Sequence, residues 1–157
     1  MKNESEFCTI IKNSMVDGFK IPDPSGDFAM TIKRAFDGIG MIEKDNKFTF
    51  VCWEAKFLKE LKAFSFKNVR DHQDYYLNSY ARADNILCYL IVGIDVSRTD
   101  KRAYIFDYKD IGHELYQKEI SLHKSILDKL PYNPIKNGLF SFNNIIMKSD
   151  IIHLVKI

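Results

Sequence analysis

Asp37, Glu54 and Lys56 have the side-chain types and the spacing that a metal-dependent hydrolytic site requires. Residues 48–56 are rich in aromatic and β-branched types and predict a strand, in which alternate side chains share one face. Glu54 and Lys56 would therefore stand side by side, with the carbonyl of Ala55 between them. Carboxylate and carbonyl oxygens bind hard divalent cations, and a nearby ammonium orients water or stabilises charge on phosphorus. This pattern favours phosphodiester hydrolysis.

The same Glu-x-Lys pattern occurs on many solvated strands as an ordinary charge pair, so its structural context decides its meaning. Periodicity and turn signals predict the elements that would supply that context. In the first half of the chain they are a helix over 4–16, a strand over 28–36 that ends at Asp37, a hairpin over 38–42 and 47–56, and a helix over 69–80 capped by Asn68. In the second half they are strands over 86–96 and 101–108, a helix over 110–130, and strand tendency over 139–147 and 151–157.

Three segments of the chain resemble the PD-(D/E)XK nuclease superfamily, and within it the RecU-type Holliday junction resolvases. The first two are DGIG at 37–40 and WEAK at 53–56, which are similar to the Asp-x-x-Gly and Phe-Glu-Ala-Lys of those enzymes. The third and most specific is FSFKNVRDHQ at 64–73, which is similar to Phe-Pro-Leu-Lys-Asn-Phe-His-x-His-Gln. The resolvases have a long stalk segment ahead of the aspartate, whereas this chain has only a short stretch around 21–27. Nothing after residue 111 aligns.

The resemblance implies an α/β fold of the PD-(D/E)XK type, with a mixed central sheet flanked by helices. It implies catalytic roles for Asp37, Glu54, Lys56 and Gln73, and a magnesium ion, replaceable by manganese, on Asp37, Glu54 and the Ala55 carbonyl. Gln73 is equally well explained as a solvated helix residue. Two acidic residues of the first helix, Glu4 and Glu6, are weaker candidates for a further ligand, because carboxylates in a first turn also simply favour the helix dipole.

Basic residues near the aspartate and after the Glu-Ala-Lys strand predict a local surface for a nucleic-acid backbone. They are Lys33, Arg34, Lys59, Lys62, Lys67 and Arg70. The phenylalanines interleaved with them allow a different interpretation, in which the segment is a solvated, amphipathic edge whose aromatic rings pack in the core. Composition alone is compatible with both, and the resemblance favours contact with DNA.

Length and charge limit the classes of protein that this sequence can encode. The 157 residues, 46% of them hydrophobic, predict one domain over 1–157, with a helix over about 1–18 and an extension over about 112–157. The 23 basic and 21 acidic residues leave a net charge of only +2, so binding of nucleic acid by bulk charge is not indicated. The sequence contains no apolar run of membrane-spanning length and no signal-peptide pattern, which predicts a cytoplasmic protein. The cysteines and histidines show no zinc-ligand spacing and predict packing roles.

Three functions follow from these observations. The first is a magnesium-dependent endonuclease that acts on branched DNA as a Holliday junction resolvase, and such an enzyme is expected to be a homodimer because two strands of opposite polarity must be cut symmetrically. The second is a nuclease of a phage, a mobile element or a restriction system that acts on duplex or single-stranded DNA. The third is a nucleic-acid-binding protein that keeps the nuclease scaffold without turnover.

Overall fold

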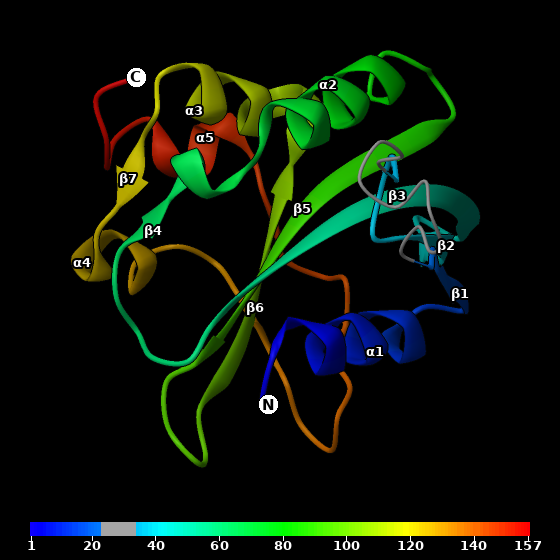
Figure 1. The fold of residues 1–157 in the computed structure, drawn as a ribbon, viewed down its shortest axis with the longest axis horizontal. Helices are drawn as coiled ribbons and strands as arrows, with labels where there is room; N and C mark the ends of the chain where they lie inside the picture. Colours follow the sequence, from blue (N-terminus) through cyan, green and yellow to red (C-terminus); the bar gives the residue numbers. More distant parts are fainter. Residues whose placement is uncertain (23–33) are drawn as a thin grey trace, which may run out of the picture.

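A mixed central sheet flanked by helices forms an α/β fold in the computed structural model, which describes residues 1–22 and 34–157 (Figure 1). Within these residues the sheet has seven strands in the order β1-β2-β3-β5-β6-β8, with β9 also beside β6. The strands are β1 (Asp17–Lys20), β2 (Gly38–Lys44), β3 (Lys47–Leu58), β5 (Ile86–Asp95), β6 (Lys101–Asp107), β8 (Asn133–Pro134) and β9 (Ile145–Ile146). This coarse class is the one predicted from the sequence.

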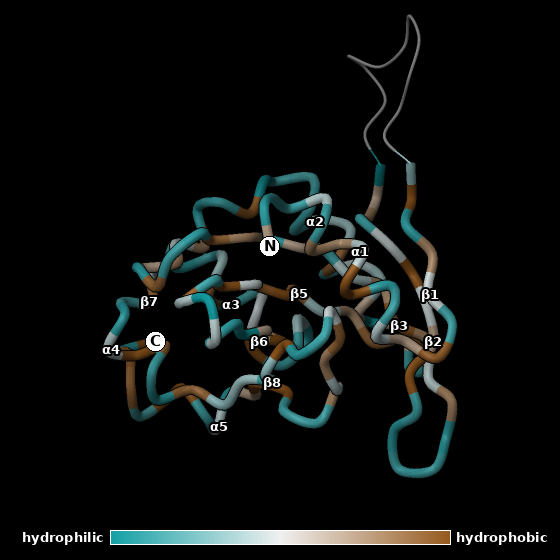
Figure 2. The backbone as a smooth tube through the Cα atoms, turned by 90° about the horizontal axis from the view of Figure 1, so that it is seen from below, coloured by the Kyte–Doolittle hydropathy of each residue, from teal (hydrophilic) through white to brown (hydrophobic). Residues whose placement is uncertain are grey.

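The antiparallel strands β1, β2 and β3 carry the Asp-x-x-Gly and Glu-Ala-Lys segments. Gly38 pairs with Trp53 and Lys44 with Lys47, which confirms the predicted hairpin. Asp45 and Asn46 form its turn in the left-handed region, with φ of 52° and 61°, and both residue types tolerate that conformation in tight hairpin turns. In Figure 2 this hydrophilic turn projects from the rest of the molecule.

The helix α2 (Asp71–Tyr80) connects β3 to β5, which run parallel and are hydrogen-bonded neighbours. Such a connection must cross from one end of the sheet to the other, and a helix is its usual form. The pairing places Glu54 next to Leu90, in the middle of the sheet. Residues Ile86–Asp95 are almost all buried, as predicted for a strand that is covered on both faces.

Both faces of the sheet pack against apolar side chains. On one face Val51, Trp53 and Ala55 contact the apolar side of α1 (Glu4–Ser14), whereas Cys52 joins the core on the side of α2. The side chains of β3 therefore alternate between the two faces, as its sequence predicts. All three cysteines of the chain are buried and free. Within residues 1–22 and 34–157, no helix has the length and apolarity needed to cross a membrane.

Shorter elements complete the half of the molecule around α2 (Figure 1). They are β4 (Phe64–Ser65), which pairs with β7 (Ser121–Leu122), the 3₁₀ turn η1 (Phe66–Asn68), the π-helical turn η2 (Tyr108–Gly112), and the helices α3 (His113–Gln117), α4 (Lys124–Leu127) and α5 (Lys148–Ile151). Phe64 and Phe66 lie in the core, so these rings are packing residues.

The prediction of a strand that leads into Asp37 needs correction. Most of the predicted range 28–36 lies outside the described residues, and Arg34 to Phe36 is not a strand. The strand beside β2 is β1, which follows α1 after a bend at Met15 and Val16 and pairs with β2 at the sheet edge. Asp37 therefore stands at the start of β2 and not at the end of a preceding strand.

Four other predicted elements differ from the structure. The predicted helix over 110–130 is wrong, because Glu119 adopts a left-handed φ of 50° after α3 and the chain then pairs with β4. The predicted strand over 151–157 is wrong, and within 139–147 only Ile145–Ile146 is a strand. The helix predicted over 69–80 begins at Asp71, with Arg70 and not Asn68 at its N-cap.

Candidate active site

Asp37 is a buried carboxylate that is held against β3 by backbone hydrogen bonds. Its N–H donates to the Trp53 carbonyl at 3.1 Å, and its Oδ2 accepts from the Ala55 N–H at 2.8 Å. Its Oδ1 accepts from the Arg34 guanidinium in an ion pair. The next residue must be glycine, because a Cβ on Gly38 would lie 2.1 Å from Trp53 Cζ2. The Asp37-Gly38 sequence therefore lets the chain approach β3 closely enough to fix the carboxylate.

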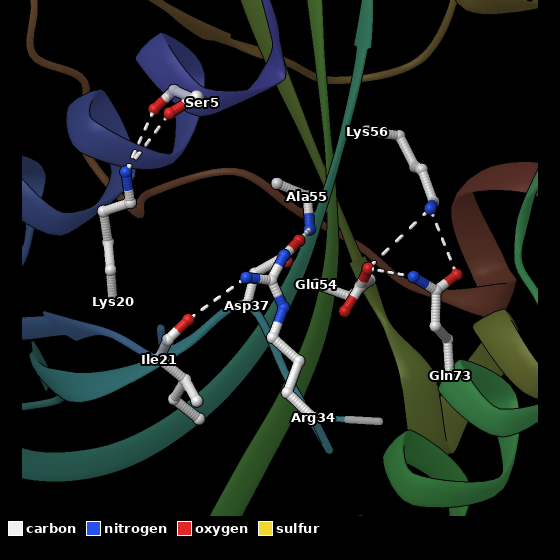
Figure 3. A network of polar contacts seen from close by, with 9 residues as sticks. All are labelled: Ser5, Lys20, Ile21, Arg34, Asp37, Glu54, Ala55, Lys56 and Gln73. Atoms are coloured by element: carbon white, nitrogen blue, oxygen red, sulfur yellow. Dashed lines mark hydrogen bonds and ion pairs between the residues drawn. The ribbon is translucent and has the colours of Figure 1, made fainter. Parts of the chain in front are cut away.

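Glu54 is a second buried carboxylate, on the face of β3 that α2 covers. The side chain of this residue is almost inaccessible, and Gln73 Nε2 donates a hydrogen bond to its Oε1. Lys56 Nζ lies 3.7 Å from the same oxygen. Glu54 and Lys56 are two residues apart on one strand, so they share a face as the sequence predicts. Figure 3 shows both side chains pointing toward Gln73.

Gln73 joins the first turn of α2 to the two charged residues of β3. Its Oε1 accepts from Lys56 Nζ at 3.1 Å and from the Arg70 N–H at 2.9 Å, while its Nε2 donates to Glu54. The second of these bonds also satisfies a backbone donor at the start of the helix. The amide thus has partners for both of its polar atoms, and it fixes the distance between the Glu54 carboxylate and the Lys56 ammonium (Figure 3).

The two carboxylates interact strongly, because both are buried and close together. Burial and the neighbouring Asp37 carboxylate together raise the pKa of Glu54 to about 8, and the Lys56 ammonium opposes both effects. A carboxyl group that keeps its proton near neutral pH is typical of a catalytic or binding site, where ionisable groups are buried close together. A cation between the carboxylates would favour the ionised form of Glu54.

Glu4, at the start of α1, lies at the mouth of this site. One hollow of about 340 Å³ is lined by Glu4, Arg34 and Asp37, and an adjacent hollow of about 440 Å³ is lined by Glu4, Arg34, Glu54, Lys56, Arg70 and Gln73. Burial raises the pKa of Glu4, with Lys56 opposing and Asp37 contributing. In the sequence, Glu4 and Glu6 are equal candidates for a further ligand, but only Glu4 lies at this site. The Glu6 carboxylate accepts from the Lys2 N–H and lines neither hollow.

The donor types at this site are those that a small divalent cation takes. Within residues 1–22 and 34–157, no three side chains of His, Cys, Asp and Glu gather into a metal cluster, so an ion would depend on two carboxylates, a carbonyl and water. Magnesium commonly takes such a set, because it keeps several waters. The Ala55 N–H points at Asp37, and the N–H and C=O of a strand residue point to the same side, so the Ala55 carbonyl also lies on the Asp37 side.

The predicted basic residues do not form one continuous surface. Arg34 and Arg70 line the hollow at Glu54, but Lys67 pairs with Glu119 at 3.3 Å and Lys62 with Glu60 at 3.6 Å. Lys59 is exposed just after β3, and Lys33 lies outside the described residues. The positive charge that lines the two hollows therefore comes from Lys20, Arg34, Lys56 and Arg70. Of these, Arg34 is paired with Asp37 and Lys56 with Glu54.

A polar cluster behind α2, which the sequence analysis missed, anchors the helix that carries Gln73. Tyr108 Oη donates to Asp74 Oδ1 at 2.5 Å, and His113 Nδ1 lies 2.8 Å from the same oxygen. Asp74 and Tyr108 are buried, and burial together with the hydrogen bond to Asp74 raises the pKa of Tyr108. Because Asp74 directly follows Gln73, these bonds fix the first turn of α2 against η2 and α3. In the sequence, the acidic residue directly after Gln73 is the signal that could have indicated this cluster.

Comparison with known proteins adds no identification to this geometry. Neither a scan against protein-family models nor a search of curated proteins finds a match to the chain.

Proposed function

We propose that this protein is a magnesium-dependent endonuclease that hydrolyses phosphodiesters in branched DNA, with the Holliday junction as its substrate. The observation that carries the proposal is the convergence of Asp37, Glu54, Lys56 and Gln73, which come from two strands and a helix, beside hollows open to solvent. Burying two adjacent carboxylates costs free energy, which a bound cation would offset, and groups perturbed in this way are concentrated at functional sites.

Each residue has a role that its contacts support. Asp37, Glu54 and the Ala55 carbonyl would hold Mg²⁺, with Mn²⁺ able to replace it, and the ion would supply an activated water and neutralise charge on the phosphate. Lys56 Nζ would orient the water or stabilise the phosphorane-like charge. Gln73 would keep Lys56 and Glu54 apart at a fixed distance through its two hydrogen bonds. Arg34 and Arg70 at the hollow would bind neighbouring phosphates.

The resemblance supports the choice of enzyme class and substrate. A mixed sheet flanked by helices is the architecture that it implies, and the PD-(D/E)XK core is part of this proposal. A homodimer would present two sites to two strands of opposite polarity, as symmetric resolution of a junction requires. The sequence predicts a cytoplasmic protein, and an enzyme that acts on bacterial or phage DNA would meet its substrate in the cytoplasm.

Cleavage of labelled DNA tests the proposal directly. The purified protein is incubated with a four-way junction, a fork and a linear duplex of matched sequence, in Mg²⁺ and in EDTA. We expect Mg²⁺-dependent cuts that are fastest on the junction, and a loss of at least about 100-fold in rate for Asp37→Asn. Asp45→Asn, in the exposed hairpin turn where asparagine is favoured, is the matched control and should cleave like the wild type.

The same experiment separates the alternatives. Equal cleavage of the junction and the linear duplex would exclude junction resolution as the specific function. It would favour a nuclease of phage, mobile-element or restriction type. DNA binding without cleavage in Mg²⁺ or Mn²⁺, unchanged by Asp37→Asn, would replace the enzyme by a nucleic-acid-binding protein on the same scaffold.

A further inference from the structure

A third hollow lies on the other side of α1 from the site. It measures about 540 Å³ and lies between the β5–β6 turn, which contributes Arg98, Thr99 and Lys101, and the segment after β8, which contributes Lys136 and Gly138. In Figure 1 the β5–β6 turn and the segment after β8 both approach the N-terminal end of α1. We call this feature the turn hollow. None of its residues takes part in the site described above.

The turn hollow carries positive charge that the protein itself does not neutralise. Arg98 and Lys136 are exposed, and within residues 1–22 and 34–157 neither side chain has a hydrogen-bond or ion-pair partner. Lys101 is paired with Asp95 at 3.2 Å. The acidic residue of the lining, Glu6, already accepts from the Lys2 N–H at 2.7 Å. Two uncompensated cations on facing walls of a hollow favour an anionic ligand.

The backbone of the Lys136 turn adds neutral donors to the same wall. Lys136 and Leu139 exchange two hydrogen bonds, of 2.9 Å and 3.1 Å, which close the turn. The two central residues, Asn137 and Gly138, adopt left-handed φ of 53° and 71°, and their own N–H groups take no part in those bonds. A Cβ on Gly138 would meet nothing within 4 Å, so the turn faces open space. Successive outward N–H groups beside a lysine are a common anion-binding arrangement.

The first turn of α1 sets the distance between the turn hollow and the site. Glu4 lines the hollows at Asp37 and Glu54, whereas Glu6 lines the turn hollow. Residues two apart on a helix point to nearly opposite sides, so the hollows are separated by about one helix diameter, roughly 10 Å. One strand of a duplex carries a phosphate about every 3.4 Å along the axis, so this spacing corresponds to about three phosphates.

We propose that the turn hollow binds a backbone phosphate of the DNA strand whose scissile phosphate lies at the Asp37–Glu54 site, about three nucleotides away along the axis. The inference rests on the proposed function and adds to it a contact made in part by Lys136, which lies in the extension that the resemblance does not cover. Arg98 and Lys136 hold the phosphate from two sides, and the N–H groups of Asn137 and Gly138 donate to its oxygens. The contact positions the strand and reads no bases.

The test compares two double variants with the same change in charge. Arg98→Gln/Lys136→Gln removes the free cations of the turn hollow, and Lys124→Gln/Lys129→Gln removes two exposed lysines at α4, on a different part of the molecule. Binding of labelled junction and duplex is measured in EDTA at several salt concentrations, and cleavage is measured in Mg²⁺. We expect the negative slope of log affinity against log salt concentration to become shallower by about 2 for the first variant. The slope should stay unchanged for the second variant. In cleavage, KM should rise by a larger factor than kcat falls.

The outcomes distinguish this inference from the proposed function. A wild type that cleaves DNA, with an Arg98→Gln/Lys136→Gln variant whose salt slope matches the wild type, would overturn the turn-hollow inference alone. An equal loss of slope in both double variants would also overturn it, because the effect would then be one of net charge. A wild type that neither binds nor cleaves DNA would overturn both proposals.

Discussion

The backbone N–H of Ala55 donates a hydrogen bond of 2.8 Å to the Asp37 carboxylate, although the two residues are 18 positions apart in the sequence. The bond ties the start of β2 to the residue between Glu54 and Lys56. Because the donor is the backbone, the position of Asp37 relative to Glu54 is set by the pairing of β2 with β3 and not by the side chain of residue 55. A shift of this register by one residue would move Glu54 to the other face and separate the carboxylates.

The raised pKa of Glu54 predicts that the metal-free protein loses stability as the pH rises. The folded state keeps this proton up to a pKa of about 8, whereas the unfolded chain releases it near 4.5. The folded state therefore binds more protons between these values, and the free energy of unfolding should fall by on the order of 1 kcal/mol per pH unit. Urea denaturation in EDTA should show this fall in the wild type and a weaker one in Glu54→Gln. Glu60→Gln, an exposed control, should follow the wild type, and equal slopes in all three proteins would contradict the prediction.

Magnesium should stabilise the folded protein, and more strongly at high pH than at low pH. Its binding requires ionised Glu54, so protonation competes with the ion below the pKa of about 8. At a free concentration about 100 times the dissociation constant, the ion adds roughly 2.7 kcal/mol to the free energy of unfolding. Thermal melting with MgCl₂, against NaCl of equal ionic strength, measures the effect. Asp37→Asn should lose most of it, and a shift of equal size in that variant would place the ion elsewhere.

Gln73→Glu should shift the pH dependence of cleavage. The variant places another carboxylate beside Glu54 and replaces the amide donor, so the pKa of Glu54 should rise further and the activity should need a higher pH. Gln73→Met, which removes the hydrogen bonds to Glu54, Lys56 and the Arg70 N–H without adding charge, should lower kcat by about tenfold and leave the pH profile in place. Profiles of kcat against pH for the two variants provide the measurement. Identical profiles for Gln73→Glu and the wild type would show that this residue does not contact Glu54 in the working enzyme.

Glu4 and Glu6 provide a matched comparison on one turn of helix. Glu4→Gln should reduce kcat by about tenfold or more, because its carboxylate lies at the hollow beside Asp37 and Lys56 and can bind a water or an ion there. Glu6→Gln makes the same chemical change outside that hollow and should keep kcat within about twofold. Single-turnover cleavage of saturating DNA measures both. Equal rates for the two variants would mean that Glu4 has no role in cleavage and only interacts favourably with the helix dipole.

The Asp74 cluster should stabilise α2 and, through it, the position of Gln73. Asp74→Ala leaves the buried Tyr108 hydroxyl without its acceptor, so the free energy of unfolding should fall by about 1–3 kcal/mol. Tyr108→Phe should couple to it in a double-mutant cycle by about 1 kcal/mol, because the two changes remove the same bond. Asp84→Ala, an exposed substitution after the same helix, is the control. Additive effects of Asp74→Ala and Tyr108→Phe in urea denaturation would refute the coupling.

The sequence by itself determined the local geometry of the candidate site. The alternation along β3 placed Glu54 and Lys56 on one face and Trp53 and Ala55 on the other, because side chains in a strand alternate whatever lies around them. The hairpin between β2 and β3, the helix before β5 and the buried strand β5 also followed from local patterns. These features depend on neighbouring residues only, which is why periodicity and turn types predict them.

Only the tertiary structure decided which residues meet and how strongly they interact. It brought Glu4 from α1 to the site and Gln73 between Glu54 and Lys56, made β1 the strand beside β2, and divided the segment after residue 110 into short elements. It also raised the pKa of Glu54, since burial and the closeness of Asp37 arise only when β2 pairs with β3. Contacts between distant segments depend on how whole elements pack, and a pattern within one element carries no information about that packing.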